Sequence, residues 1–351
     1  MKRKKVLFIQ NSLEHYRFPL YDYLQEYYGE ITICHIGKPI LNDSKVKEVV
    51  LNFYSLKGFY FQKKLLSLTR EYDVIVGMFD LKWPFIWSLP LFLKKDQRFL
   101  LWGIGVSTEN GLDKNKKLDF IRFHIAKLAA GVIFYSNYPL KKYIDRGFNS
   151  NELFVGNNTI KCDYKIDIHK REFNKILFFG SLTKRKRVDI LIDAYSIIKE
   201  KTDTSIYLEI VGNGPEKVIL ENYVIKKGLK NSVRFLDSIY DQKKKLNIFN
   251  NAICTVSPGQ AGLSVLESFS FGVPFVTSSD AITGGERFNI IEGETGFFVD
   301  DTDSLAYLLM RLIKNKSYIR KISENCFNYY WEKSQIKHMA EGFIKAFDYT
   351  K

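Results

Sequence analysis

SPGQAGLSVLESFSFGVPFV, residues 257–276, is the stretch from which we predict the fold of this chain. Small residues at 258–262 predict a loop, the apolar run that holds Glu267 predicts a helix, and the Gly-Val-Pro at 272–274 predicts a turn before a strand. Glycines let a ligand approach the backbone, and a helix start directs free N–H groups and a positive dipole end into the same space. This arrangement suits a phosphate or diphosphate, with Glu267 able to accept hydrogen bonds from a ribose or sugar hydroxyl. The alternative is an ordinary loop-to-helix junction of an α/β domain.

The composition is that of a globular protein with two domains. The chain has 351 residues, of which 46% are apolar, so each half can bury a core. The basic start, residues 1–5, resembles that of a signal peptide, but the apolar run after it is too short for one. No run reaches the length of about 20 apolar residues that a membrane span needs. Four widely spaced cysteines indicate reduced thiols in a cytoplasm, with neither a disulfide framework nor a zinc site: Cys34, Cys162, Cys254 and Cys326.

The net charge of +14 is concentrated in the first half of the chain. Residues 1–165 hold 26 Lys and Arg against 16 Asp and Glu, whereas the remainder holds 27 against 23. A basic first half predicts an anionic partner, which can be a membrane surface, a nucleic acid or a phosphorylated substrate. The alternative is the background of a lysine-rich proteome.

The first half begins with alternating strands and helices. The predicted elements are a strand at 5–10, a polar loop at 11–17, a helix at 19–28 and a second strand at 31–36. Such a series starts a doubly wound parallel sheet, whose ligands lie beyond the carboxyl ends of the strands. His15, Tyr16 and Arg17 occupy one such strand end. Gly103 and Ile104 occupy another, after a predicted strand at 99–102.

Two segments of the first half combine apolar and basic residues. Residues 60–70 are predicted as a helix that mixes aromatics, leucines and lysines. Residues 83–93 are nearly all apolar and run into Lys94 and Lys95. A basic edge beside exposed aromatics suits a membrane interface, whereas a core helix is the alternative for an apolar run of this length.

The second half repeats the alternation after a polar stretch, residues 157–174, that we interpret as a linker. Three of its predicted strands end in residues that suit a ligand: Gly180-Ser181 with the basic cluster at 184–187, Gly212-Asn213-Gly214-Pro215, and the loop at 258–262. In a parallel sheet these ends lie at one edge. Together they offer backbone donors, the Lys186 ammonium and the Glu267 carboxylate, which are what a nucleoside diphosphate requires.

These segments resemble the donor domain of glycosyltransferase family 4, whose members are retaining enzymes of the GT-B fold. Residues 176–189, ILFFGSLTKRKRVD, resemble its strand and basic segment, and 211–216, VGNGPE, resemble its Gly-x-Gly-Pro turn. Residues 257–276 resemble its Glu-x7-Glu region, and 284–299, GGERFNIIEGETGFFV, its closing glycine-rich stretch. The first half is similar more loosely, through the His-Tyr-Arg loop and WGIG at 102–105.

The resemblance implies roles for particular residues of the second half. Lys186 falls on the basic residue that contacts the donor diphosphate, while Ser181 stands where the family carries an arginine. Glu267 matches the acid that binds the donor ribose. The acid that touches the donor sugar falls on Gly259, so that carboxylate is missing here.

Carried over in full, the resemblance gives three sets of residues. The donor-binding set is Gly180, Ser181, Lys186, Gly212, Gly214, Pro258, Gly259, Gln260, Gly262, Leu263 and Glu267, with the amides of Gly262 and Leu263 on the β-phosphate. The acceptor-binding set is Tyr16, Arg17, Trp102, Gly103 and Ile104. The catalytic set is Lys186, Glu267, Arg17 and His15; Ile104 stands where relatives carry a histidine, and Arg17 or His15 supplies a polar group instead. No metal or other cofactor is expected.

The implied fold is α/β of the GT-B type, with two Rossmann-like, doubly wound parallel-sheet domains facing a cleft. Residues 1–165 are expected to form an N-terminal acceptor-binding domain and residues 172–330 a C-terminal nucleotide-sugar-binding domain. Residues 331–351 are expected to form a C-terminal helix that can pack back on the N-terminal domain.

The implied function is that of a hexosyltransferase-type enzyme. It would transfer a sugar, with retention, from a nucleoside-diphosphate sugar to a hydroxyl of a glycan acceptor in bacterial surface polysaccharide, lipopolysaccharide or capsule synthesis. The expected acceptor is lipid-linked, and an anionic membrane surface is an expected partner, so the protein would be cytoplasmic and peripheral at the inner face of the cell membrane. Nucleic acid is not expected. Two alternatives remain open: a GT-B sugar-nucleotide epimerase that needs no acceptor, and a basic module that binds nucleic acid or anionic lipid without catalysis.

Overall fold

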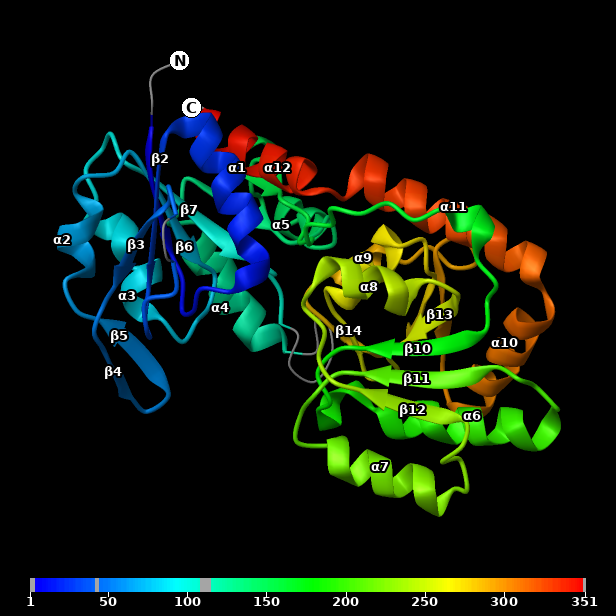
Figure 1. The fold of residues 1–351 in the computed structure, drawn as a ribbon. Coiled ribbons are helices and arrows are strands. Elements are labelled where there is room, and N and C mark those ends of the chain that lie inside the picture. The colour runs from blue at the N-terminus through cyan, green and yellow to red at the C-terminus, as the bar shows by residue number, and fades with distance from the viewer. Residues whose placement is uncertain (1–3, 42–43, 108–114, 350–351) are drawn as a thin grey trace. The chain divides into compact units, whose positions relative to one another are not determined.

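The structure is a computed structural model that describes residues 4–41, 44–107 and 115–349. The first three residues of the basic start lie outside the described residues. The chain divides into two compact units (Figure 1): unit 1 comprises Met1–Lys161 and Ile336–Lys351, and unit 2 comprises Cys162–Gln335. The division therefore falls at 161/162 and 335/336, a few residues from the boundaries expected from the sequence.

Unit 1 is built on a seven-stranded parallel sheet with the order β3-β2-β1-β6-β7-β8-β9. The strands are β1 (Lys5–Ile9), β2 (Glu30–His35), β3 (Lys47–Val50), β6 (Val74–Met78), β7 (Arg98–Gly103), β8 (Gly131–Phe134) and β9 (Leu153–Val155). The helices are η1 (His15–Arg17), α1 (Phe18–Tyr28), α2 (Leu65–Thr69), α3 (Pro84–Trp87), η2 (Leu89–Leu91), α4 (Lys116–Ala126), α5 (Leu140–Ile144), η3 (Ser150–Glu152) and α12 (Ile336–Asp348).

The C-terminal helix α12 belongs to the core of unit 1. It packs against α1, β8 and β9, and its Phe343 and Phe347 rings contact Phe8 at centroid distances of 5.8 and 6.1 Å. Both of these phenylalanines are buried. Apolar residues at helical spacing give α12 one continuous apolar face, which the sheet of unit 1 covers.

A β-hairpin replaces the helix that we predicted at the start of 60–70. Strands β4 (Phe53–Leu56) and β5 (Phe59–Gln62) pair antiparallel around Lys57 and Gly58, and the helix α2 begins only at Leu65. Lys57 and Gly58 both have positive φ, 48° and 83°, which is the requirement of a two-residue hairpin turn. The prediction was wrong because a Lys-Gly pair is a weaker turn signal than Asn-Gly or Asp-Gly.

The apolar segment 83–93 divides between core and surface. It forms two short helices, α3 and η2, each of which carries a proline in its first turn. Trp83, Ile86 and Leu89 are buried, whereas Leu91 and Phe92 are 65% and 63% exposed. The segment is therefore neither a single core helix nor a fully exposed segment.

Unit 2 is built on a six-stranded parallel sheet with the order β12-β11-β10-β13-β15-β17. The strands are β10 (Lys175–Phe179), β11 (Tyr207–Val211), β12 (Val233–Leu236), β13 (Ala252–Val256), β15 (Phe275–Ser278) and β17 (Gly296–Val299), with a separate pair β14 (Gln260–Ala261) and β16 (Ile282–Thr283). The helices are η4 (Ile168–Lys170), η5 (Lys184–Lys186), α6 (Val188–Lys201), α7 (Lys217–Lys226), α8 (Gln242–Phe249), α9 (Ser264–Ser270), η6 (Glu286–Asn289), α10 (Thr302–Lys314) and α11 (Lys316–Lys333).

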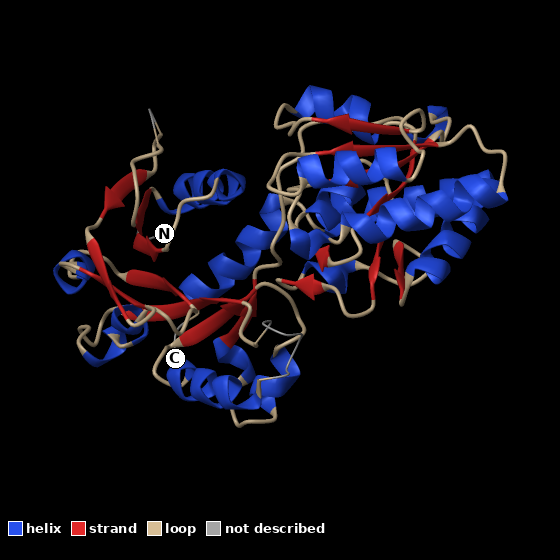
Figure 2. Cartoon of the chain, turned by 90° about the horizontal axis from the view of Figure 1, so that it is seen from below, coloured by secondary structure: helices blue, strands red, loops and turns tan. Residues whose placement is uncertain are grey.

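Helices cover both faces of the unit 2 sheet (Figures 1 and 2). Helix α6 packs with α7 and α10, while α9 packs with α11 on the opposite face. The strand order reverses between β10 and β13, which makes that position the switch point where ligands bind in doubly wound sheets. The predicted α/β fold with two doubly wound parallel sheets is confirmed.

The predicted linker is anchored in unit 2 by a buried arginine. Arg171 is 1% exposed, and its guanidinium donates to the carbonyl oxygen of Gly272 (2.6 Å), to the hydroxyl of Ser323 (3.2 Å) and to the carbonyl oxygen of Ala252. Burial lowers the pKa of Arg171 to about 9. These bonds tie Arg171 to the turn after α9, to α11 and to β13, so this part of the stretch is not a free linker.

Three further findings concern the cysteines, metal binding and membrane-spanning helices. All four cysteines are buried, and none forms a disulfide bond. Over 4–41, 44–107 and 115–349, no cluster of three or more His, Cys, Asp and Glu is arranged to hold a metal ion. Over the same ranges, no helix combines the length and the apolar character that crossing a bilayer requires.

Candidate functional site

Three loops meet at the carboxyl edge of the unit 2 sheet. The loop after β10 is joined to the loop after β11, since the Leu182 amide donates to the Asn213 carbonyl (2.9 Å) and the Glu216 amide donates to Leu182 (3.1 Å). It is also joined to the loop after β13, because the Gly259 amide donates to the Lys186 carbonyl (3.1 Å). The three strand ends that the sequence singled out therefore form one surface.

Glycines make this close approach of backbones possible. A Cβ atom at Gly212 would lie 1.8 Å from the Gly180 carbonyl oxygen, and one at Gly259 would lie 2.1 Å from the Arg185 carbonyl oxygen. Both distances are far inside van der Waals contact, and Gly212 also has φ of +151°. A side chain at either position would separate the loops. A Cβ at Gly262, in contrast, would meet no atom within 4 Å, so that residue faces open space.

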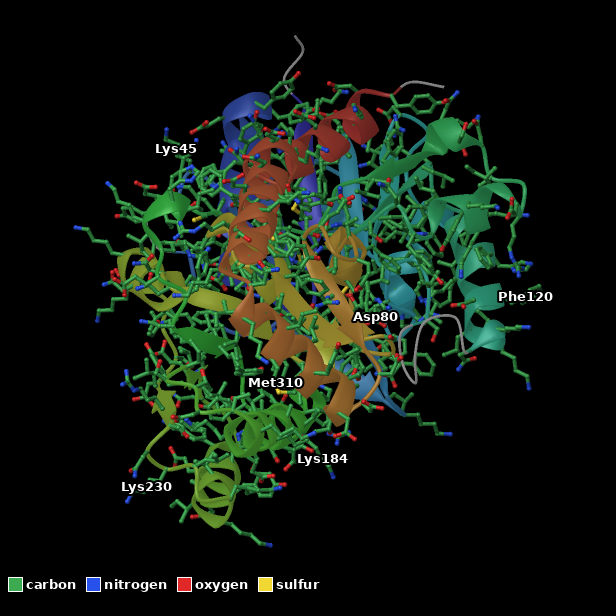
Figure 3. All side chains as sticks on the ribbon, turned by 90° about the vertical axis from the view of Figure 1, so that its right-hand side faces the viewer. Lys45, Asp80, Phe120, Lys184, Lys230 and Met310 are labelled. Atoms are coloured by element: carbon green, nitrogen blue, oxygen red, sulfur yellow. The ribbon has the colours of Figure 1, made fainter. Side chains whose placement is uncertain are left out.

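Lys186 differs from its basic neighbours in being buried. Lys184 (labelled in Figure 3), Arg185 and Arg187 are exposed. Lys186, in contrast, is only 8% exposed. Its Nζ lies 4.0 Å from the position that a Cβ of Gly180 would take. Burial lowers the pKa of Lys186 from 10.5 to about 8, with the Glu286 carboxylate acting in the opposite direction. The ammonium is therefore held beside the Gly180 backbone, partly stripped of water, at the switch point.

Glu267 forms an ion pair beside the same strand end. Its carboxylate lies 2.5 Å from Lys245 Nζ, and both side chains are 13% exposed. Lys245 Nζ also lies over the Phe179 ring, 5.8 Å from its centroid. Burial raises the pKa of Glu267 against the opposing effect of Lys245. Lys245 thus places the Glu267 carboxylate near the Phe179 ring, and Lys186 lies beside Gly180, the next residue of the chain.

The remaining donor-set residues line these loops. Pro258 is buried, Gly259, Gln260 and Leu263 are half-buried, and Ser181 is exposed. The helix after them, α9, begins at Ser264 and has seven residues, so its dipole is that of a short helix. The pair β14–β16 brings 282–283 beside 260–261.

Glu286 is a residue of this region that our sequence analysis did not select. It is 5% exposed, and its Oε2 accepts hydrogen bonds from the Gly284 amide (3.0 Å) and the Thr283 hydroxyl (3.5 Å). Its charge acts on Lys186. The only sequence signal was an acid directly after two glycines in GGERFN. Glu286 lies near these loops only because β16 pairs with β14, and this pairing could not be predicted from the sequence.

A hollow of about 640 Å³ lies next to these loops, beside α6 and α7. Thr183, Lys184 and Arg187 line it together with Asp193 and Tyr223, but Lys186, Gly259 and Glu267 do not. Its lining lacks the buried ammonium and the glycine backbones, and it therefore lies apart from the site that the three loops form.

Arg17 is the centre of the predicted site in unit 1. Its guanidinium donates to Gln10 Oε1 (2.5 Å) and to the Tyr135 hydroxyl (2.9 Å), and it lies 4.4 Å from the centroid of the Trp102 ring. Trp102 is 1% exposed, so its side chain lies in the core beneath Arg17 and cannot itself be a surface contact.

The other candidate site residues of unit 1 directly precede Arg17 in the chain or lie at the end of β7, and they differ in exposure. His15 is exposed and its ring lies against Phe18 at 5.1 Å, while Tyr16 is half-buried with the Arg17 guanidinium 5.5 Å from its ring centroid. Gly103 is buried against Phe79, and Ile104 is half-buried. The structure thus brings Tyr16 and Trp102 to Arg17 at the carboxyl edge of the unit 1 sheet.

The two doubly wound units define the GT-B fold. Over 97% of its length the chain is similar to 98% of the crystal structure of HepE from Anabaena in complex with UDP, with a TM-score of 0.75 and 16% identity. A glycosyltransferase from Rickettsia africae gives a TM-score of 0.76 at 14% identity, over 99% of this chain and 98% of that one. These likenesses show the fold.

Sequence comparison then points to a family for unit 2. Residues 164–329 match the family model described as glycosyl transferases group 1. The chain is 31% identical over 145 residues to the O-antigen biosynthesis glycosyltransferase WclY of Escherichia coli, covering 40% of this chain and 37% of that protein. This match spans little more than a third of the relative's length. The matched segment is similar to glycosyltransferase group 1 domains, and this similarity supports a transferase enzyme.

Proposed function

We propose that the protein is a retaining glycosyltransferase of family 4. It transfers a sugar from a nucleoside-diphosphate sugar to a hydroxyl of a glycan acceptor during synthesis of a bacterial surface polysaccharide. The observation that carries the proposal is the buried Lys186 ammonium at the switch point of unit 2, beside glycine-lined loops from three strand ends. The family match of unit 2, the UDP in the HepE structure and the O-antigen relative support it.

The chemistry follows from the charge of the departing group. When the bond between C1 of the sugar and the phosphate oxygen breaks, negative charge grows on the diphosphate. Lys186 and the backbone amides of Gly262 and Leu263 neutralise that charge without reorganising, which lowers the barrier. The acceptor hydroxyl attacks C1 from the face that the diphosphate leaves, and its proton passes to the departing phosphate oxygen. Glu267, oriented by Lys245, accepts hydrogen bonds from the ribose hydroxyls.

Unit 1 takes the acceptor in this proposal. Arg17 is fixed by Gln10, Tyr135 and the Trp102 ring, and His15 beside it is exposed. A guanidinium held in one orientation and an exposed imidazole can both bond to sugar hydroxyls or to a phosphate of the acceptor.

The acceptor is lipid-linked and the protein works at an anionic membrane surface in this proposal. An exposed apolar surface of unit 1, here called the hairpin patch, supports it: Tyr54, Leu56, Phe59, Leu66, Phe85, Leu91 and Phe92. The hairpin, α2 and α3 hold it together, as the Phe61 ring contacts both Tyr54 and Phe85 at 5.1 Å. Exposed basic residues accompany it: Lys57, Lys63, Lys64, Arg70, Lys94 and Lys95. Aromatic and basic residues together suit an anionic bilayer interface.

The activity is tested by incubating the protein with radiolabelled UDP-, GDP- and dTDP-sugars, with and without a lipid-linked glycan acceptor. We expect one donor to give acceptor-dependent release of the nucleoside diphosphate and a labelled lipid product. Formation of an epimerised sugar nucleotide without acceptor would instead identify the epimerase alternative. If no donor is consumed and none raises the melting temperature, the proposal is wrong.

A further inference from the structure

The proposed function leaves one requirement of the site unmet by the residues chosen from the sequence. A sugar bound through its diphosphate presents several hydroxyls, and a carboxylate is the side chain that accepts hydrogen bonds from two of them at once. A carboxylate near C1 also stabilises the positive charge that develops there. At position 259 no such side chain fits, because a Cβ would lie 2.1 Å from the Arg185 carbonyl oxygen and 2.7 Å from Arg187 Cγ.

A carboxylate reaches the same region from another strand. The Ile282 amide donates to the Gly259 carbonyl (3.0 Å), and Ala261 pairs with Thr283 in the β14–β16 pair. Glu286 follows three residues later, where φ of +124° at Gly285 turns the chain. Because the Gly259 amide in turn donates to Lys186, continuous backbone hydrogen bonds connect the Lys186 segment to the Glu286 segment.

The Glu286 side chain is fixed in place. Its Oε2 accepts from the Gly284 amide at 3.0 Å, and a Cβ at Gly284 would lie 3.0 Å from the same oxygen, so this glycine makes room for the carboxylate. The Glu286 backbone is held too, since the Asn289 side-chain amide donates to its carbonyl (2.8 Å) and the Tyr329 hydroxyl donates to Asn289 (2.9 Å). A side chain held this way is preorganised to bind a ligand in one orientation.

We propose that Glu286 binds the sugar of the donor, accepting hydrogen bonds from its hydroxyls in place of the acid that position 259 cannot carry. This inference rests on the proposed function. Lys186 holds the diphosphate in this proposal, and the backbone hydrogen bonds through Gly259 connect the Lys186 and Glu286 segments, so the group attached to the β-phosphate meets Glu286. The carboxylate selects donors whose sugar carries free hydroxyls on the side that faces η6, and it makes no contact with the nucleoside.

The test compares each nucleoside diphosphate with its sugar derivative. Affinities of the full chain for UDP and UDP-glucose, GDP and GDP-mannose, and dTDP and dTDP-glucose are measured by calorimetry for wild type, Glu286→Gln and Asp280→Asn. Asp280 is an exposed acid of the same 278–286 segment and serves as the matched control. Melting temperatures of all three proteins establish that they are folded.

For the nucleotide that wild type binds, we expect Glu286→Gln to bind the diphosphate within twofold of wild type but its sugar derivative at least tenfold more weakly. Asp280→Asn should match wild type for both ligands. Equal weakening of both ligands by Glu286→Gln, or no weakening of either, would overturn the assignment of Glu286 and leave the proposed function intact. Failure of wild type to bind any of the six compounds would instead overturn the proposed function and this inference with it.

Discussion

At the residue scale, the burial of the Lys186 ammonium lowers the stability of the folded protein, and the fold does not require this burial. An ammonium 8% exposed has lost much of its hydration, and its pKa of about 8 records that loss. Three exposed basic residues beside it carry charge without this penalty. A buried lysine is expected where its charge acts on a ligand, and the diphosphate of the donor is the ligand that we propose.

The Lys186→Met variant tests whether the buried charge lowers stability and supports activity. We expect kcat/KM for the donor to fall by at least about 30-fold, because stabilisation of the leaving group is lost. At pH 7, below both 10.5 and the folded-state pKa of about 8, the lysine is charged in both folded and unfolded protein. Burial of the charged lysine therefore lowers the free energy of unfolding of the wild-type protein. The methionine variant should have a free energy of unfolding about 1 to 3 kcal/mol higher.

Steady-state kinetics and urea titration measure the two effects. A variant that loses both activity and stability would show that Lys186 is a structural residue.

The pH dependence of diphosphate binding provides a second test of Lys186. The bound diphosphate favours the protonated amine, so affinity should be full below about pH 8 and fall as pH rises through that value. Arginine stays protonated throughout this range, so Lys186→Arg should flatten the profile even if its geometry weakens binding. Calorimetry between pH 6.5 and 9.5 gives both curves; parallel profiles for the two proteins would contradict the assignment.

Lys186 could be predicted from the sequence and Glu286 could not, for a physical reason. Lys186 follows its strand within a few residues, so local order predicts its place. Glu286 reaches the site through the pairing of β14 with β16, which are two residues each and leave no alternation in the sequence. Arg171 was likewise placed in a linker, because nothing local reveals that its partners are carbonyls of Ala252 and Gly272.

At the element scale, the site depends on loops that touch through glycine backbones. Gly259→Ala should push the 258–262 loop away from Arg185 and lower the free energy of unfolding by about 1 to 3 kcal/mol, as overpacking does elsewhere. Gly262→Ala is the matched control within the same loop. Its Cβ meets open space, so we expect a change of less than about 0.5 kcal/mol. Chemical denaturation gives the free energy of unfolding of both variants. Equal decreases in the two variants would show that the close approach of Gly259 to Arg185 does not contribute to stability.

The order of strands and helices was predictable at this scale, whereas the hairpin was not. Continuous apolar runs such as Lys5–Ile9 and Lys175–Phe179 are typical of buried parallel strands, and both are central strands of their sheets. The hairpin strands β4 and β5 carry exposed aromatics instead of a buried face, so their sequence does not follow the pattern of the sheet. Their exposure is what makes the hairpin a candidate for membrane contact.

At the scale of the whole molecule, the hairpin patch and the basic residues around it predict binding to anionic membranes. The full chain should float with liposomes that contain anionic lipid at low salt, and less of it should float as salt rises. Leu91→Glu with Phe92→Glu should reduce flotation at least fivefold, because both side chains are more than half exposed. Phe120→Glu is the matched control: Phe120 is 55% exposed on α4, outside the patch (Figure 3). Equal flotation of the patch variant and the control would remove the patch from the proposal.

The central claim is that unit 2 holds a nucleoside diphosphate where the loops after β10, β11 and β13 meet. A crystal structure of the full chain with the nucleoside diphosphate that it binds tests this directly, through the distance from Lys186 Nζ to the phosphate oxygens. We expect a hydrogen-bonded distance of about 2.7 to 3.2 Å, with the ribose hydroxyls at Glu267. A diphosphate bound in the hollow beside α6 and α7, or anywhere out of reach of Lys186, would contradict it.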